Sequence, residues 1–228
     1  MVIEASPWLE DNQWILDLAA GTPSIVAFVG NLSEVLGKSS FDSTLATLAQ
    51  LPPFRGIRVS PGALAGNMSN FAALADQGMM IDVLGSPADL MGVATFAAKL
   101  PKLRIVIDHV GGVSIDGRAP PAAWLAGMQA AAAQPNVYCK VSNLVEATGS
   151  MNGNAPSDVS FYRPVLDALW TAFGEDRLVF GTNWPVSSPA APLSTVVSIV
   201  KTYFMQKGAS AFEKYFYRNG KAAYGFAT

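Results

Sequence analysis

The sequence predicts an α/β fold in which helices cover a parallel β-sheet. Three observations support it: seven short apolar runs rich in β-branched residues, longer helical patterns between most of them, and a charged fraction of only 14% in 228 residues. Parallel strands that are covered on both faces are apolar almost throughout, which fits so few charges. The alternation of strands and helices allows a doubly wound sheet or a (βα)8 barrel.

The predicted strands are mostly runs of about four to eight residues bounded by Gly, Pro, Asn or Ser. They cover residues 2–4, 24–30, 56–60, 79–84, 104–108, 137–141 and 178–181. A complete barrel needs eight strands, and the first run begins at residue 2, so a barrel would lack a strand at its amino end. No Gly-rich nucleotide-binding loop follows any run, which disfavours the nucleotide-binding versions of the fold.

The helices between these runs have recognisable ends. Ser86 offers an N-cap, Pro87 a first-turn proline and Asp89 an acidic residue to a helix that ends at Leu100, before Pro101. Further helices are expected at residues 70–77, 122–133, 162–173, 193–204 and 211–216. The Gly-, Asn- and Ser-rich loop 145–159 is the predicted mobile cover, and residues 1–228 are expected to form a single domain.

Composition excludes several classes of protein. The net charge is −2 and the 15 basic residues are scattered, which argues against a nucleic-acid partner. The first residues do not resemble a secretory signal and no stretch resembles a membrane span, so we expect a cytoplasmic protein that acts on a small molecule. The single cysteine, Cys139, excludes an internal disulfide.

Polar residues gather where the predicted strands end, the place where α/β barrels carry their chemistry. They are Glu4, Ser6, Asn31, Arg58, Asp82, Asp108, His109, Lys140, Ser142, Asn183 and Trp184. The plainer explanation is that strand ends meet solvent.

His109 is the only histidine, and it ends an apolar strand before a glycine turn. It is a candidate general acid or base, or a single metal ligand, while the alternative is a hydrogen-bonded structural residue. With one His and one Cys, a multi-histidine zinc site is impossible within this sequence.

Two cations and one aromatic residue complete the candidate site. Arg58 could orient a substrate carboxylate or brace an outer loop through surface pairs. Lys140, inside an apolar strand, is either a substrate anchor or a partner in an ion pair with Asp108 or Glu146. Trp184 either lines the mouth or seals the barrel end. Cys139 faces away from Lys140 by strand alternation, which indicates a packed thiol.

These segments together resemble the amidohydrolase-related family of TIM-barrel hydrolases, which contains sugar-acid lactonases and pyrone-dicarboxylate hydrolases. The resemblance runs from Val2 to about Phe226. It depends on the segments 54–58, 107–111, 137–142 and 176–185, and on 217–220 before a short final helix. It implies an incomplete TIM (βα)8-type barrel of about seven strands. It also implies that His109 polarises the substrate carbonyl or holds a metal, and that Arg58, Lys140 and Trp184 contact the substrate.

The sequence departs from the family pattern at two places. The family's first strand ends in a His-x-His pair that helps to hold Zn or Mn, and nothing here supplies it. The family's aspartate before Trp-Pro, which takes the proton from water, is replaced by Asn183. As a catalytic candidate, Asn183 can position the water by hydrogen bonds, but its carboxamide cannot accept the proton. If a general base remains, Asp82 or Asp108 is the expected substitute.

Two functions therefore stay open: a hydrolase of a lactone or similar ester of a small carboxylate, or a catalytically inactive barrel that binds a small molecule or serves as a scaffold. Decarboxylation on the same barrel would need the same missing ligands. The open strand edges predict either a longer natural polypeptide or a homo-oligomer in which another chain covers the gap.

Overall fold

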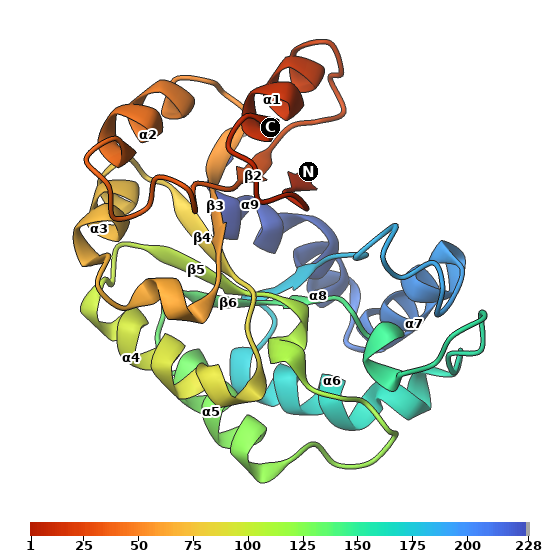
Figure 1. Ribbon diagram of the computed structural model, residues 1–228. Helices are drawn as coiled ribbons and strands as arrows, with labels where there is room; N and C mark the ends of the chain where they lie inside the picture. The colour runs from red at the N-terminus through yellow and green to blue at the C-terminus, as the bar shows by residue number, and fades with distance from the viewer. Residues whose placement is uncertain (227–228) are drawn as a thin grey trace.

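The computed structural model describes residues 1–226 and contains one parallel sheet of seven strands in sequential order (Figure 1). The strands are β1 (Val2–Ile3), β2 (Phe28–Gly30), β3 (Phe54–Val59), β4 (Met80–Val83), β5 (Arg104–Ile107), β6 (Val137–Val141) and β7 (Leu178–Phe180). Each strand pairs in parallel with the next one along the chain. All seven predicted strands are present, although β2 is shorter than the predicted run 24–30.

The sheet curls into a half-barrel that stays open among the described residues. β1 pairs with β2 and β7 pairs with β6, which makes β1 and β7 the two edges of the sheet. Helices ring the outer, convex side of the curve (Figure 1). The predicted α/β, TIM-like architecture with seven strands is therefore confirmed, and the last two residues of the predicted domain, 227–228, lie outside the described part.

The helices are α1 (Asp11–Ala20), α2 (Phe41–Ala49), α3 (Met68–Asp76), α4 (Leu90–Lys99), α5 (Ala122–Ala132), α6 (Val159–Phe173), α7 (Leu193–Gln206), α8 (Ala209–Glu213) and α9 (Asn219–Tyr224). Helices α1 and α2 were not predicted from the sequence. In α2 the residues Phe41, Leu45 and Leu48 form a buried stripe at helical spacing. In α1 this pattern is weaker, because Trp14 and Leu18 are exposed.

Local sequence determines where α4 starts. The Asp89 carboxylate accepts hydrogen bonds from both the backbone N–H (2.8 Å) and the hydroxyl (2.7 Å) of Ser86, which closes a capping box before the helix. The N-cap predicted at Ser86 is confirmed for the 3-10 turn Pro87–Asp89, which leads directly into α4. None of the described helices is both long and apolar enough to cross a membrane.

The inner side of the sheet carries a small apolar layer, separate from the large core under the outer helices. Val29, Met80, Val106 and Val179 point inward and pack against Tyr224 of α9. The side-chain amide of Asn219 anchors α9 at the amino ends of the strands, because it donates to the backbone oxygens of Glu175 (2.8 Å) and Leu178 (2.9 Å). Helix α9 thus closes the floor of the half-barrel, and the carboxyl ends of the strands are left to form its mouth.

Candidate active site

Above the apolar layer, four charged side chains project inward from neighbouring strands: Arg58 of β3, Asp82 of β4, Lys140 of β6 and Asp108, which follows β5. Strand register explains why they meet. Arg58 lies directly opposite Asp82. Cys139 lies opposite Ile107, so that Lys140 is level with Asp108. Cys139 itself packs in the outer core, which confirms its predicted orientation.

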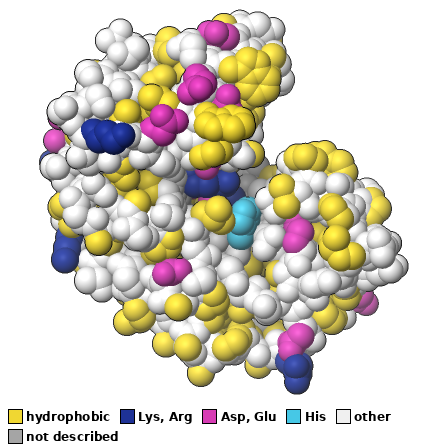
Figure 2. Space-filling model, in the orientation of Figure 1, with side chains coloured by type: hydrophobic (Ala, Val, Ile, Leu, Met, Phe, Trp, Pro, Cys, Tyr) yellow, Lys and Arg dark blue, Asp and Glu magenta, His cyan; other side chains and the backbone are white. Residues whose placement is uncertain are grey.

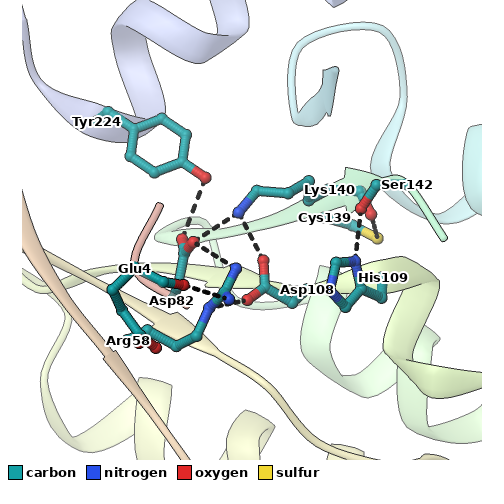
Figure 3. Close-up of polar contacts among 9 residues, drawn as sticks. All are labelled: Glu4, Arg58, Asp82, Asp108, His109, Cys139, Lys140, Ser142 and Tyr224. Carbon is teal, nitrogen blue, oxygen red and sulfur yellow. Dashed lines mark hydrogen bonds and ion pairs between the residues drawn. The ribbon is translucent and has the colours of Figure 1, made fainter. Parts of the chain in front are cut away.

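These side chains form one continuous ion network (Figure 3). The Lys140 Nζ lies 2.5 Å from Asp82 Oδ2 and 2.6 Å from Asp108 Oδ1. The Arg58 Nε lies 2.9 Å from Asp108 Oδ2, and its Nη2 lies 3.9 Å from Asp82 Oδ2. The two cations and two carboxylates balance, which is what burial of charge requires.

Two further groups contact the network: the backbone oxygen of Glu4 on the side of the mouth and the Tyr224 hydroxyl on the side of the floor helix. Arg58 Nη1 donates to the backbone oxygen of Glu4 (3.0 Å), and the Tyr224 hydroxyl donates to Asp82 Oδ1 (3.1 Å). The Lys140 ammonium also lies 5.5 Å from the centre of the Tyr224 ring. The floor helix is therefore tied directly to the charged layer.

The carboxylates of Asp82 and Asp108 are both buried, but their pKa values are shifted in opposite directions. Burial and the neighbouring Asp108 charge raise the pKa of Asp82 to about 6, against the opposing effect of Lys140. Burial also acts to raise the pKa of Asp108, but Lys140 and Arg58 outweigh it and hold that pKa below its usual value. The charges of Asp108 and Asp82 keep the pKa of Lys140 well above normal despite its burial. Lys140 therefore stays charged at neutral pH.

His109 lies immediately beyond Asp108, in a turn with left-handed backbone. Its φ is 53°, and that of Val110 is 49°, a region that His adopts more readily than most residues. The ring Nδ1 lies 2.8 Å from the Ser142 hydroxyl oxygen. Burial lowers the pKa of His109 to about 4, which makes the imidazole neutral at pH 7.

A second polar group forms the rim at the ends of β6 and β7. The side-chain amide of Asn183 donates to Glu146 Oε1 (2.8 Å) and to Asn143 Oδ1 (3.3 Å). Asn143 and Asn183 have φ of 60° and 54°, and Asn is among the few residue types that tolerate this conformation. Asn143 follows Ser142, so this group adjoins the partner of His109.

The mouth is open to solvent. Figure 2 shows the one histidine of the chain at the floor of a notch, beside Lys or Arg side chains. Trp184 follows Asn183 and exposes 47% of its surface, while the Arg58 side chain exposes 15% and Asp82 none. A solute in the mouth can thus reach His109 and Trp184 more easily than the buried network.

The structure brings most of the predicted site residues together. Arg58, Asp82 and Lys140 share one network, and His109 and Asn183 follow β5 and β7, on either side of β6. Of the two pairings expected for Lys140, the one with Asp108 is present, whereas the Glu146 side chain bonds Asn183 instead. The catalytic role predicted for Asp82 stays a prediction, and its contacts favour a role in the ion network. Glu146 was not predicted as a site residue, because it lies in a loop outside any strand pattern.

The side chains present do not fit a divalent metal centre within the described chain. A zinc site uses three or four His, Cys, Asp or Glu ligands. Residues 1–226 contain no group of three such side chains placed to hold an ion. Asp82 and Asp108 are turned instead toward Lys140 and Arg58. His109 as a single metal ligand stays a prediction.

Comparison with known protein families identifies the family to which this half-barrel belongs. The Amidohydrolase family matches residues 2–226, nearly the whole chain. The chain belongs to this family. The resemblance inferred from the sequence segments is therefore confirmed.

Two curated relatives of this chain are named L-fucono-1,5-lactonase. The one from Burkholderia ambifaria is 34% identical over 196 residues, which cover 82% of this chain and 64% of that protein. The one from Burkholderia multivorans is 35% identical over 147 residues, which cover 62% of this chain and 49% of that protein. The chain thus spans less than two thirds of the length of either lactonase in these matches.

Solved structures agree with the architecture. A crystal structure of an amidohydrolase from Burkholderia multivorans with bound zinc has a TM-score of 0.89 and 26% identity, covering 99% of this chain and 83% of that one. A protein from Pseudomonas putida described as a 2-pyrone-4,6-dicarboxylic acid hydrolase has a TM-score of 0.75 and 23% identity, covering 96% and 78%. The second likeness concerns the fold alone.

Proposed function

We propose that this amidohydrolase hydrolyses the ring ester of a small polar lactone that carries hydroxyl or carboxylate groups. Membership of the family and the names of the two lactonase relatives support the reaction class. The observation that carries the proposal is the neutral imidazole of His109, held by Ser142 at the open mouth of the half-barrel.

In this proposal His109 polarises the lactone carbonyl. When the Ser142 hydroxyl donates to Nδ1, the proton of the neutral ring resides on Nε2, which can then donate to the carbonyl oxygen. Negative charge grows on that oxygen as water attacks, so this hydrogen bond strengthens in the transition state. Because the pKa of His109 is about 4, the ring keeps this single proton across the neutral pH range.

The remaining predicted residues would bind and orient the substrate. Arg58 retains a partly exposed guanidinium face at the top of the network, suited to a carboxylate or a ring hydroxyl. Lys140 is nearly buried between two carboxylates, so in this proposal it acts mainly by holding Asp82 and Asp108 in place. The half-exposed Trp184 ring offers an apolar face to the sugar-like ring.

A second candidate is a small-molecule-binding protein without turnover. Two observations favour it: an amide, Asn183, stands where the family pattern has an aspartate, and the described residues assemble no metal-ligand group. The mouth of the half-barrel would then bind the same lactone or its open acid.

Turnover separates the two candidates. We expect the purified chain to open sugar-acid lactones such as L-fucono-1,5-lactone, followed by proton release, with the spontaneous rate subtracted. His109→Asn keeps a residue type that tolerates positive φ, and it should lower kcat about 100-fold or more. Saturable binding by calorimetry without turnover would favour the binding protein, and equal rates for the two chains would contradict the role of His109.

A further inference from the structure

Ester hydrolysis needs a group that takes the proton from attacking water, and the predicted candidates are unsuited. The Asn183 amide cannot accept that proton. Asp82 is fully buried, with its oxygens facing Lys140 and Tyr224. Asp108 is 1% exposed and contacts Lys140 and Arg58. Both carboxylates are therefore enclosed by the cations of the network and do not face a water in the mouth.

Glu146, at the rim, has the arrangement that these carboxylates lack. One oxygen, Oε1, accepts the hydrogen bond from the Asn183 amide at 2.8 Å. The other oxygen, Oε2, is buried from bulk solvent and has no hydrogen-bond partner in the structure. A carboxylate oxygen in such a position is costly unless something supplies it with a proton donor.

The neighbours of Glu146 place it beside the candidate chemistry. Asn183 bridges Glu146 to Asn143, and Asn143 directly follows Ser142, which bonds His109. The group therefore lies at the ends of β6 and β7, and the imidazole lies next to it at the end of β5.

Resting on the function proposed above, we propose that Glu146 is the general base of this chain, with Asn183 as the positioning residue that orients its carboxylate. The free Oε2 accepts a hydrogen bond from the attacking water. This assigns to a pair of residues, an amide and a glutamate, the work that a single aspartate does in the family pattern.

The proton and electron balance closes without a co-reactant. The water oxygen forms a bond to the carbonyl carbon while its proton passes to Oε2, and the carbonyl electron pair moves onto the oxygen that faces His109. As the carbonyl re-forms, the ring C–O bond breaks, and Glu146 returns the proton to the leaving ring oxygen. The product is the open hydroxy acid, and Glu146 is again ionised.

The environment of Glu146 suits this exchange. Burial raises its pKa above the usual value, and the hydrogen bonds from its own backbone N–H and from the Asn183 amide only partly oppose the rise. A base with a raised pKa accepts a proton from water more readily in the transition state. Tyr162 of α6 is a nearby titratable group, and burial raises the pKa of its phenol, so it stays neutral.

Glu146→Gln is the central variant, because the Gln carbonyl oxygen can still accept the Asn183 hydrogen bond but cannot accept a proton. We expect kcat for lactone opening to fall about 100-fold or more, with little change in KM. The acid limb of the wild-type pH–rate profile should also disappear. Glu213→Gln, at an exposed glutamate paired with Arg218, is the matched control and should keep the wild-type profile.

Rescue distinguishes a base from a structural residue. Adding Asn183→Asp to Glu146→Gln restores one carboxylate at the rim, and we expect at least a tenfold recovery of kcat with a new acid limb. If Glu146→Gln keeps the wild-type rate and pH profile while the wild type turns over, the inference is wrong and the proposed function stands. If the wild type opens no lactone, the proposed function fails, and the assignment of Glu146 as base fails with it.

Discussion

The inner charged layer and the rim of this half-barrel are adjacent, but their polar groups are used differently. In the inner layer Arg58, Asp82, Asp108 and Lys140 contact one another so closely that each cation faces both carboxylates. At the rim His109 has a neutral ring with one nitrogen held by Ser142, and Glu146 has one oxygen without a partner. The charges of the inner layer are paired with one another, whereas Glu146 Oε2 at the rim has no hydrogen-bond partner in the described structure.

This difference separates two tasks. A buried network of balanced charges fixes the strands and the floor helix relative to one another, and removing one member exposes the others to the full cost of burial. Rim groups that lack partners are available to a substrate. We therefore expect changes in the inner layer to act first on stability and changes at the rim to act first on turnover.

The largest effect on stability should come from Lys140→Met. It leaves Asp82 and Asp108 buried without the ammonium that both contact, and we expect the free energy of unfolding to fall by about 3–5 kcal/mol. Urea denaturation followed by circular dichroism measures it. Arg118→Met, which breaks the exposed pair with Asp116, is the control and should change nothing measurable. A loss for Lys140→Met as small as that of the control would contradict the structural role of the network.

The next effect is the pH dependence of stability that His109 produces. Its pKa is about 4 in the folded chain and 6.5 in the unfolded chain, so the unfolded state binds more protons between these values. Stability should therefore rise with pH across this window, by up to about 3 kcal/mol, and the gain should be lost as pH falls through 6.5 toward 4.

Asp82 changes the pH dependence of stability in the opposite direction. Because its pKa is raised to about 6, the Asp82 carboxyl stays protonated to a higher pH in the folded chain than in the unfolded chain. The stability that this bound proton contributes is lost as pH rises through that value. His109→Asn removes the first effect and keeps the second. Between pH 4 and pH 7, the unfolding free energy of the wild type should therefore increase with pH relative to that of His109→Asn. Parallel curves would contradict the buried, neutral imidazole.

Tyr224→Phe tests the connection between floor and network. It removes the hydroxyl that donates to Asp82 Oδ1 and leaves the ring in its apolar layer, so the expected loss is about 1–2 kcal/mol in unfolding free energy. The stability of the chain carrying both Tyr224→Phe and Asp82→Asn should differ from that of Asp82→Asn alone by less than this. Full additivity of the two changes would show that the hydroxyl and the carboxylate do not interact.

The smallest stability effect is expected at the rim, for Ser142→Ala. Loss of the hydroxyl that contacts His109 Nδ1 should cost about 1 kcal/mol. It should also change the tautomer ratio of the imidazole, visible in its nitrogen NMR shifts, and lower kcat. Ser43→Ala, on the exposed surface of α2, serves as the control. Unchanged imidazole shifts would contradict the contact between Ser142 and His109.

Much of the fold could be predicted because the relevant signals are local. The apolar runs marked all seven strands, Ser86 and Asp89 marked the start of α4, and Gly174 marked the end of α6. Position along a strand also predicted that Lys140 and Cys139 face opposite sides. Helix α1 was missed because its exposed Trp14 and Leu18 obscure the periodic pattern.

The site was harder to predict because it depends on contacts between distant residues. Tyr224 reaches Asp82 across 142 positions, and no local pattern indicates which end of the sheet α9 closes. Glu146 lies in a loop, and its link to Asn183 depends on how that loop returns over the end of β7. One signal was readable in retrospect: His109, Asn143 and Asn183 are residue types that tolerate positive φ, each placed directly after or near the end of a strand.

The most direct test of the division between inner layer and rim is a paired measurement on His109→Asn at pH 7, where the wild-type imidazole is neutral. Lactone turnover and unfolding free energy are measured on the same preparation. We expect kcat to fall about 100-fold or more while the free energy of unfolding stays within about 1 kcal/mol of wild type. Wild-type turnover by this variant would show that His109 takes no part in the chemistry at the rim.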